Sequence, residues 1–160
     1  MENILGNIYD WFQSFYGQSL SYYLWGFDPA TGGFTNSNIY NLVGLITLVI
    51  SLLFVVTFYY IFNHPSLCKW WSWLIALGIN GSIALLIGYS IVWSKYLNGY
   101  IPQGLVYTTD ADGNIASILI DNACVSGFGI ANMFVSMIMF FILSFTLKWW
   151  SSSAKHVPFL

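Results

Sequence analysis

The acidic side chains best suited to binding a metal ion lie in one stretch past the middle of the sequence. Asp110, Asp112 and Asn114 stand at the first, third and fifth positions of a calcium-loop spacing. Asp121 stands at the twelfth position. However, Ile115 occupies the sixth position, where such a loop needs glycine for its sharp turn. The spacing therefore favours an ordinary hairpin turn over a calcium site.

A second set of metal-ligating types is formed by His64, Cys68 and His156, but their flanks show no recurring ligand spacing. The apolar runs of the chain contain no Asp, Glu, Lys, Arg or His, so they offer no intramembrane base, proton relay or charge-coupled transport path. No Gly-x-Ser-x-Gly elbow is present either. We therefore expect no enzyme, no metal site and no cofactor.

Composition decides the class of protein that must position these residues. Of 160 residues, 58% are hydrophobic and only 6% are charged, a balance that a water-soluble domain could not cover with polar surface. Four lysines and no arginine cannot form a patch that neutralises phosphates, so nucleic-acid binding is excluded. The partners we expect are the lipid bilayer and either copies of the chain or other membrane subunits.

Three apolar runs are each long enough, as helices, to cross the roughly 30 Å hydrocarbon core of a bilayer. They cover about residues 39–62, 73–94 and 123–147. Because the first two are joined by a short connection, they should form an antiparallel helical hairpin over 39–95. The sequence thus predicts an all-α integral membrane protein with three transmembrane helices. Tryptophans near the ends of these runs are expected to be interface anchors: Trp70, Trp71, Trp73, Trp93, Trp149 and Trp150.

The flanking segments are expected to lie at the membrane surface. Residues 3–17 show a helical period that separates an apolar from a polar face, which predicts an interfacial amphipathic helix. Residues 21–38 are rich in turn-forming and aromatic residues and are expected to be a linker at headgroup depth. Residues 1–38 would form one extracytoplasmic region. We expect the amphipathic helix to pack on transmembrane helices rather than to sense membranes reversibly, because its polar face carries no Lys or Arg.

A β-hairpin is predicted within the loop of residues 96–122. The runs 105–109 and 115–120 are strand-like and flank the turn signal Asp112-Gly113, which places the hairpin at about 104–120. Lysines set the orientation: three fall on one side of a three-span model and Lys95 on the other. This bias predicts an N-terminus outside the cell and a short cytoplasmic tail over 151–160. The two cysteines then lie on opposite faces and cannot form a disulfide.

Inside the predicted spans, small and weakly polar residues recur at helical spacing. Such stripes let helix backbones approach and allow polar side chains to bond across the interface. The residues expected to pack an oligomer are Gly44, Thr47, Ser51, Gly78, Gly81, Gly88 and Gly129. The candidates for a pore lining or a subunit contact are Asn80, Ser82, Asn132, Ser136 and Phe140.

The surroundings of Asn80 would distinguish a subunit contact from a pore lining. By helical spacing we expect Asn80 to point away from the face of Gly78 and Gly88. If lipid tails covered that other side of the helix, burying the Asn80 amide among them would be costly. Contact with another subunit is favoured over a water-filled pore and over contact within one bundle. Two functions remain: a non-enzymatic oligomer that forms a pore or channel, and an accessory subunit or anchor of a larger membrane complex.

Overall fold

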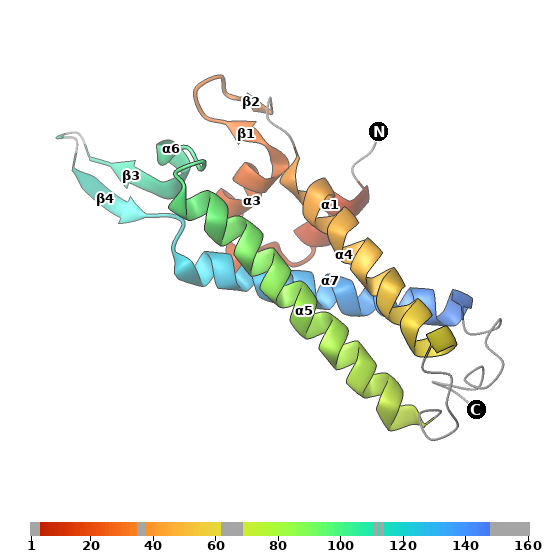
Figure 1. Cartoon of the computed structure of the whole chain (residues 1–160). Coiled ribbons are helices and arrows are strands. Elements are labelled where there is room, and N and C mark those ends of the chain that lie inside the picture. Colours follow the sequence, from red (N-terminus) through yellow and green to blue (C-terminus); the bar gives the residue numbers. More distant parts are fainter. Residues whose placement is uncertain (1–3, 35–37, 62–68, 111, 113, 148–160) are drawn as a thin grey trace. The chain divides into compact units, whose positions relative to one another are not determined.

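The computed structural model of the chain is mostly helical and describes residues 4–34, 38–61, 69–110, 112 and 114–147. Three of its helices are long and apolar enough to cross a membrane: α4 (Ile39–Val56), α5 (Trp70–Leu97) and α7 (Asn122–Leu147). In Figure 1 they are the long coils drawn in orange to yellow, green and blue. The prediction of three long apolar helices is confirmed by this architecture.

The ends of these helices differ from those predicted. α4 continues into a π-helix, η1 (Thr57–Ile61), and the predicted last residue of the run, Phe62, lies outside the described residues. α5 is longer at both ends than predicted, because neither its flanking tryptophans nor Lys95 breaks a helix. The chain leaves α5 at Gly99, whose φ of 68° is a left-handed conformation that favours glycine. α7 begins after Asp121, whose carboxylate accepts a hydrogen bond of 2.9 Å from the N–H of Cys124.

The single amphipathic helix predicted over residues 3–17 is wrong in part. The segment forms two short helices, α1 (Ile4–Asp10) and α2 (Gln13–Tyr16), separated by a turn. Gly17, with a φ of 81° and a ψ of 162°, ends the second of them, because this backbone conformation cannot continue a right-handed helix. A third helix, α3 (Gln18–Trp25), follows immediately.

The predicted linker of residues 21–38 is therefore also partly wrong, since α3 occupies its start. After α3, strand β1 (Phe27–Asp28) pairs antiparallel with β2 (Gly33–Phe34). The turn between them is stabilised by the Asp28 carboxylate, which accepts a 3.0 Å hydrogen bond from the N–H of Ala30. Residues 35–37 lie outside the described part of the chain.

The predicted β-hairpin is present with shorter strands. β3 (Tyr107–Thr109) pairs antiparallel with β4 (Ile115–Ile118), with Thr108 opposite Ser117 (Figure 1). The start of the first predicted strand instead belongs to a short helix, α6 (Gln103–Val106). The hairpin turn is closed by the N–H of Asp110, which donates to the carbonyl of Asn114 at 2.8 Å.

The chain divides into two compact units, and each long helix contributes residues to both. Unit 1 comprises Met1–Gly44 and Leu85–Asn132, and unit 2 comprises Leu45–Ala84 and Met133–Leu160. Unit 1 has an aromatic core that contains the fully buried Tyr9, Tyr16, Tyr40 and Phe128. Unit 2 has a separate core of buried residues: Val55, Phe58, Tyr59, Trp73 and Phe140.

Candidate functional site

Asn80, the polar residue on which the sequence analysis placed most weight, lies inside unit 2. Its side chain is fully buried, and its Nδ2 donates to Ser136 Oγ at 2.6 Å and to Ser51 Oγ at 3.1 Å. Of the three alternatives for Asn80, these hydrogen bonds correspond to the least favoured, contact within one bundle. Asn80 lies one turn before the buried Ala84 and so shares its side of α5.

The buried polar cluster of unit 2 thus joins α4, α5 and α7. Ser51 and Ser136 are themselves fully buried, and their hydroxyl oxygens lie 3.4 Å apart. Thr47 and Ser144 are buried in unit 2 as well. Within the described residues Asn80 Oδ1 is buried without a hydrogen-bond partner. Of the residues named as pore lining, Asn80 and Ser136 are therefore buried in contact with each other within unit 2.

The glycines of the predicted packing stripes have different surroundings. In unit 2, a Cβ added at Gly81 would stand 2.8 Å from Met137 Cε, so this glycine permits close packing of α5 on α7. In unit 1, a Cβ at Gly88 would stand 2.9 Å from Asn132 Cβ. Gly44 and Gly129 also face neighbours within unit 1, at 3.0 Å from Leu5 and 3.1 Å from the Leu85 carbonyl.

Gly78 is the exception among the glycines predicted to pack an oligomer. No described atom of another element comes within 4 Å of the position that its Cβ would take. Ser82, one turn later, is exposed, and its hydroxyl donates to the Gly78 carbonyl at 2.9 Å. This face of α5 is left open in the described part of the chain.

The aromatic residues predicted as a pore constriction or as interface anchors differ in burial: some lie in the core of unit 2 and others are exposed. Phe140, expected as a pore constriction, is fully buried in unit 2 beside Trp73, with ring centroids 6.0 Å apart. Trp73, predicted as an interface anchor, is 5% exposed, and its Nε1 donates to Ser144 Oγ at 3.3 Å, so it packs within unit 2. Trp70 and Trp71 are exposed, as anchors would be.

Of the remaining predicted anchors and the His and Cys candidate metal ligands, only Trp93 lies in the described part of the chain. Trp93 lies in unit 1, its ring stacked with those of Tyr89 and Tyr96. The other residues named from the sequence lie outside the described part of the chain: Trp149, Trp150, His64, Cys68 and His156.

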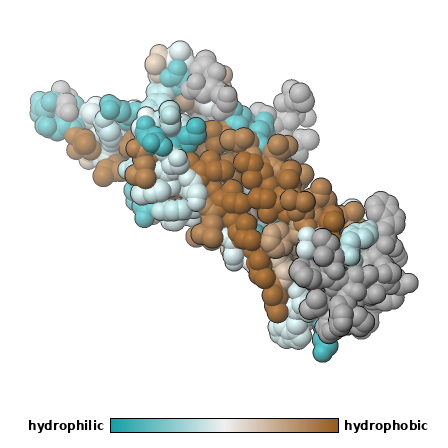
Figure 2. All heavy atoms as spheres, in the orientation of Figure 1, coloured by the Kyte–Doolittle hydropathy of each residue, from teal (hydrophilic) through white to brown (hydrophobic). Residues whose placement is uncertain are grey.

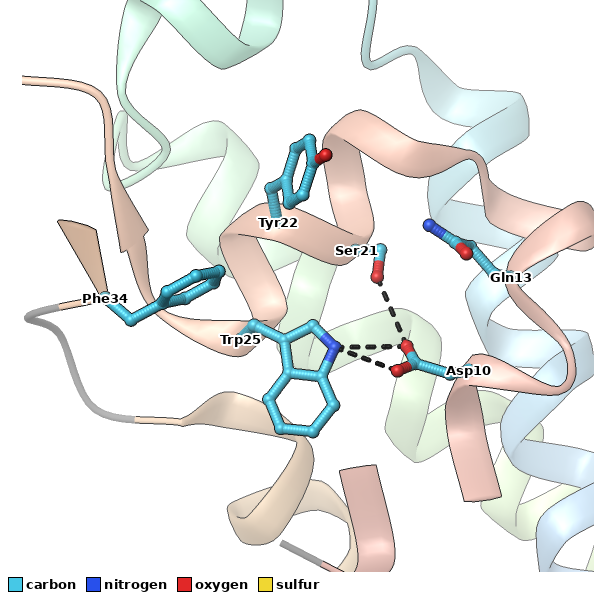
Figure 3. A pocket seen from close by; sticks show the side chains of 6 residues that line it. All are labelled: Asp10, Gln13, Ser21, Tyr22, Trp25 and Phe34. Atoms are coloured by element: carbon cyan, nitrogen blue, oxygen red, sulfur yellow. Dashed lines mark hydrogen bonds between the residues drawn. The ribbon is translucent and has the colours of Figure 1, made fainter. Parts of the chain in front are cut away.

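A pocket that the sequence analysis missed lies in unit 1, with a volume of about 380 Å³. Figure 3 shows the Asp10 carboxylate, from the end of α1, beside the Trp25 indole of α3. Trp25 Nε1 donates to both carboxylate oxygens, at 3.1 and 3.2 Å, and Ser21 Oγ donates to Oδ1 at 3.4 Å. The lining is completed by Gln13, Tyr22 and Phe34.

A series of hydrogen-bonded, buried hydroxyl groups connects Ser21 of the pocket to the aromatic core of unit 1. Tyr40 donates to Ser21 Oγ at 3.0 Å, and its hydroxyl oxygen lies 2.8 Å from that of Tyr16. Tyr16 in turn donates to the Tyr9 carbonyl at 2.9 Å. Burial raises the pKa of Tyr16 to about 12, so this hydroxyl keeps its proton at neutral pH. The network fixes Ser21, and through it the Asp10 carboxylate.

The same network reaches α7. The hydroxyl of Tyr9 donates to Asn132 Oδ1, and the Tyr9 ring stacks on that of Tyr40 with centroids 5.3 Å apart. Asn132, predicted as a pore or subunit contact, is therefore fully buried in unit 1 as a hydrogen-bond partner.

Chemically, the pocket combines one carboxylate, one amide and three aromatic side chains. The described residues contain no group of three or more His, Cys, Asp or Glu that could hold a metal ion. At the hairpin, Asp121 caps α7, and the turn is closed by the backbone hydrogen bond between Asp110 and Asn114. A carboxylate among aromatic side chains around Asp10 is suited to binding a small molecule.

The sequence offered only a weak signal for this pocket. Ser21 and Trp25 are four residues apart on one helix, the spacing that places two side chains on the same face. Asp10, however, is separated from them by the chain reversal at Gly17. No known family model, curated protein or solved structure matches the chain.

Proposed function

We propose that this protein is a non-enzymatic multi-pass membrane protein that assembles with other membrane chains through α5, in the simplest case with copies of itself. Its three long apolar helices would cross the cell membrane, with the N-terminus outside and the C-terminus in the cytoplasm. Figure 2 supports a lipid setting, since hydrophobic residues cover the long helices on the face it draws.

The observation that carries the proposal is the open face of α5. Gly78 and Ser82 are four residues apart, the small-xxx-small spacing that lets a second helix approach closely in a membrane. The Ser82 hydroxyl already bonds to its own helix, so it tolerates an apolar neighbour. Ile75 and Ile79 flank this pair and are 62% and 48% exposed. Because Ile75 and Ile79 share this side of α5, a partner helix would pack over Gly78 and Ser82 and against the two isoleucines.

A conducting pore is not part of this proposal. Of the four polar residues that would have lined it, Asn80, Asn132 and Ser136 are fully buried in their own units, and only Ser82 is exposed. The side chains that the long helices expose are mainly hydrophobic and suit contact with lipid. Examples are Leu45, Leu48, Val49, Leu53, Ile130, Phe134, Ile138, Phe141 and Ile142. A structural subunit fits this distribution better than a channel.

The mass of the purified chain in detergent tests self-assembly. Light scattering or native mass spectrometry should give a multiple of 18.1 kDa for the wild type and the monomer mass for Gly78→Leu. The variant should remain folded, because within its own chain the added side chain meets no neighbour; it should lose only the stabilisation that assembly gives the wild type. Leu53→Ala, on an exposed position of α4, is the matched control and should leave the assembly intact.

A wild-type chain that is monomeric at every detergent concentration would contradict self-assembly. It would favour the alternative, an accessory subunit or anchor of a hetero-oligomeric membrane complex.

Orientation is tested separately by labelling. With Cys68 and Cys124 replaced by serine, a cysteine introduced by Ser152→Cys should react with an impermeant maleimide only after the membrane is opened. Labelling of intact cells at this position would invert the proposed topology.

A further inference from the structure

We propose that the Asp10 pocket of unit 1 binds an organic ammonium group, of the kind found in choline or ethanolamine. This goes beyond the proposed assembly through α5, which involves none of the same residues. The pocket presents one carboxylate among aromatic side chains (Figure 3), a combination that recognises a cation by charge and by contact with ring faces.

The charge of Asp10 is available to a ligand. In the described part of the chain its hydrogen-bond donors are an indole and a hydroxyl, both neutral. The lysine of unit 1, Lys95, lies 4.8 Å from the centre of the Tyr100 ring. Two of the three contacts to the carboxylate come from one N–H, which leaves lone pairs on both oxygens. A ligand cation would supply a counter-charge that the described residues do not place on Asp10.

Aromatic walls favour an organic cation over a metal ion. Trp25 lies beside Asp10, and Tyr22 and Phe34 line the pocket farther from the carboxylate (Figure 3). Ring faces attract alkylated ammonium groups, whose charge is spread over methyl and methylene surfaces. A divalent metal would require several oxygen ligands at once, and the pocket offers a single carboxylate. Gln13 adds an amide that can donate to an oxygen on the same ligand.

The pocket is held in shape before any ligand arrives. A Cβ added at Gly6 would stand 2.4 Å from Trp25 Cη2, so the indole packs directly on the α1 backbone. The Trp25 ring also meets that of Tyr40 edge-on, with centroids 5.3 Å apart. Gln18 Nε2 donates to the Tyr22 hydroxyl at 2.7 Å, and this hydrogen bond holds the Tyr22 ring that lines the pocket. A preformed site loses little side-chain entropy on binding.

Two sources could supply the ammonium group, a lipid headgroup or a free small molecule. Both share the chemistry that the pocket recognises, and the experiment separates them. The full-length protein is placed in nanodiscs of purely anionic phosphatidylglycerol, and binding of tetramethylammonium and choline is followed by calorimetry. The neutral isostere 3,3-dimethylbutanol is the matched probe without charge. The titrations are repeated in phosphatidylcholine nanodiscs.

Both cations should bind in phosphatidylglycerol nanodiscs, and the neutral isostere should bind at least tenfold more weakly. Weaker apparent binding in phosphatidylcholine would identify the headgroup as a ligand, since lipid would then compete. Equal binding in both lipids would assign the site to free amines. Asp10→Asn, which keeps the shape and removes the charge, should reduce affinity at least tenfold. Phe34→Leu, at a 64% exposed position, should reduce it about threefold without lowering the unfolding midpoint.

The proposal is overturned if the neutral isostere binds as well as choline, or if Asp10→Asn binds choline like the wild type while remaining folded. Displacement of choline by sodium at equal concentration would also overturn it, because the aromatic walls would then contribute nothing.

Discussion

Replacing Asn80 by leucine separates the two roles that this residue could have. In the structure its amide donates to Ser51 and Ser136, and its two protons can serve two full hydrogen bonds. Interhelical hydrogen bonds of this kind contribute about 0.6 kcal/mol each in membrane proteins. Leucine is similar in size, so little packing is lost. We therefore expect Asn80→Leu to reduce the free energy of unfolding by about 1 kcal/mol and to leave the assembly mass unchanged.

The measurement is reversible unfolding in mixed micelles, followed by circular dichroism at two protein concentrations. A double-mutant cycle with Ser136→Ala should give a coupling of about 0.6 kcal/mol. Ser82→Ala, which removes a hydroxyl bonded to its own helix, is the control and should change stability little. Unchanged stability combined with a smaller assembly mass would refute the reasoning, because Asn80 would then contact another subunit.

Three further predictions concern packing, capping and the core of unit 2. Gly81→Val should cost about 1 to 3 kcal/mol in the same unfolding assay, because its Cβ would stand 3.1 Å from Met133 Cγ and 3.3 Å from Met137 Cγ, and its two methyl groups need further space. A hydrogen bond from the first turn of α7 holds the pKa of Asp121 below its usual range. Its stabilisation is therefore present above the unfolded-state pKa and lost as pH falls through the folded one, and an acid titration of Asp121→Asn should lack this loss. Trp73→Phe, which removes the hydrogen bond to Ser144 from a buried ring, should lower stability by about 1 to 3 kcal/mol, measured by chemical unfolding.

The long helices could be predicted because their signal is local. A run of apolar residues identifies a helix of sufficient length whatever lies next to it. The helix ends were less predictable, since Trp70 and Lys95 lower the hydropathy of a window without breaking the backbone. The end of α5 is set by Gly99 and its left-handed conformation.

The position of Asn80 shows what hydropathy and spacing do not determine. A helix with small residues on one side and an amide on another has two faces that could be covered. Which one meets the chain's own helices depends on how α4 and α7 dock in unit 2. Gly81 and Asn80 both face inward there, and Gly78 faces outward. The stripe of Gly78, Gly81 and Gly88 was treated as one face, but its members have different environments.

The Asp10 pocket could not have been found from sequence periodicity. The sequence places Asp10 within the predicted amphipathic helix of residues 3–17 and Trp25 within the predicted aromatic linker of residues 21–38. The two meet because Gly17 reverses the chain between α2 and α3, and because Tyr40 of α4 packs behind them. Such contacts arise from tertiary packing, which a one-helix pattern does not contain.

Intermolecular crosslinking along α5 tests the central claim most directly, that this helix keeps Asn80 inside its own chain and offers Gly78 to a partner. In a background without native cysteines, Gly78→Cys and Asn80→Cys are oxidised in the membrane and separated under non-reducing conditions. We predict a disulfide-linked dimer for the variant at Gly78 and none for the variant at Asn80. A dimer formed through position 80, with position 78 unreactive, would contradict the account.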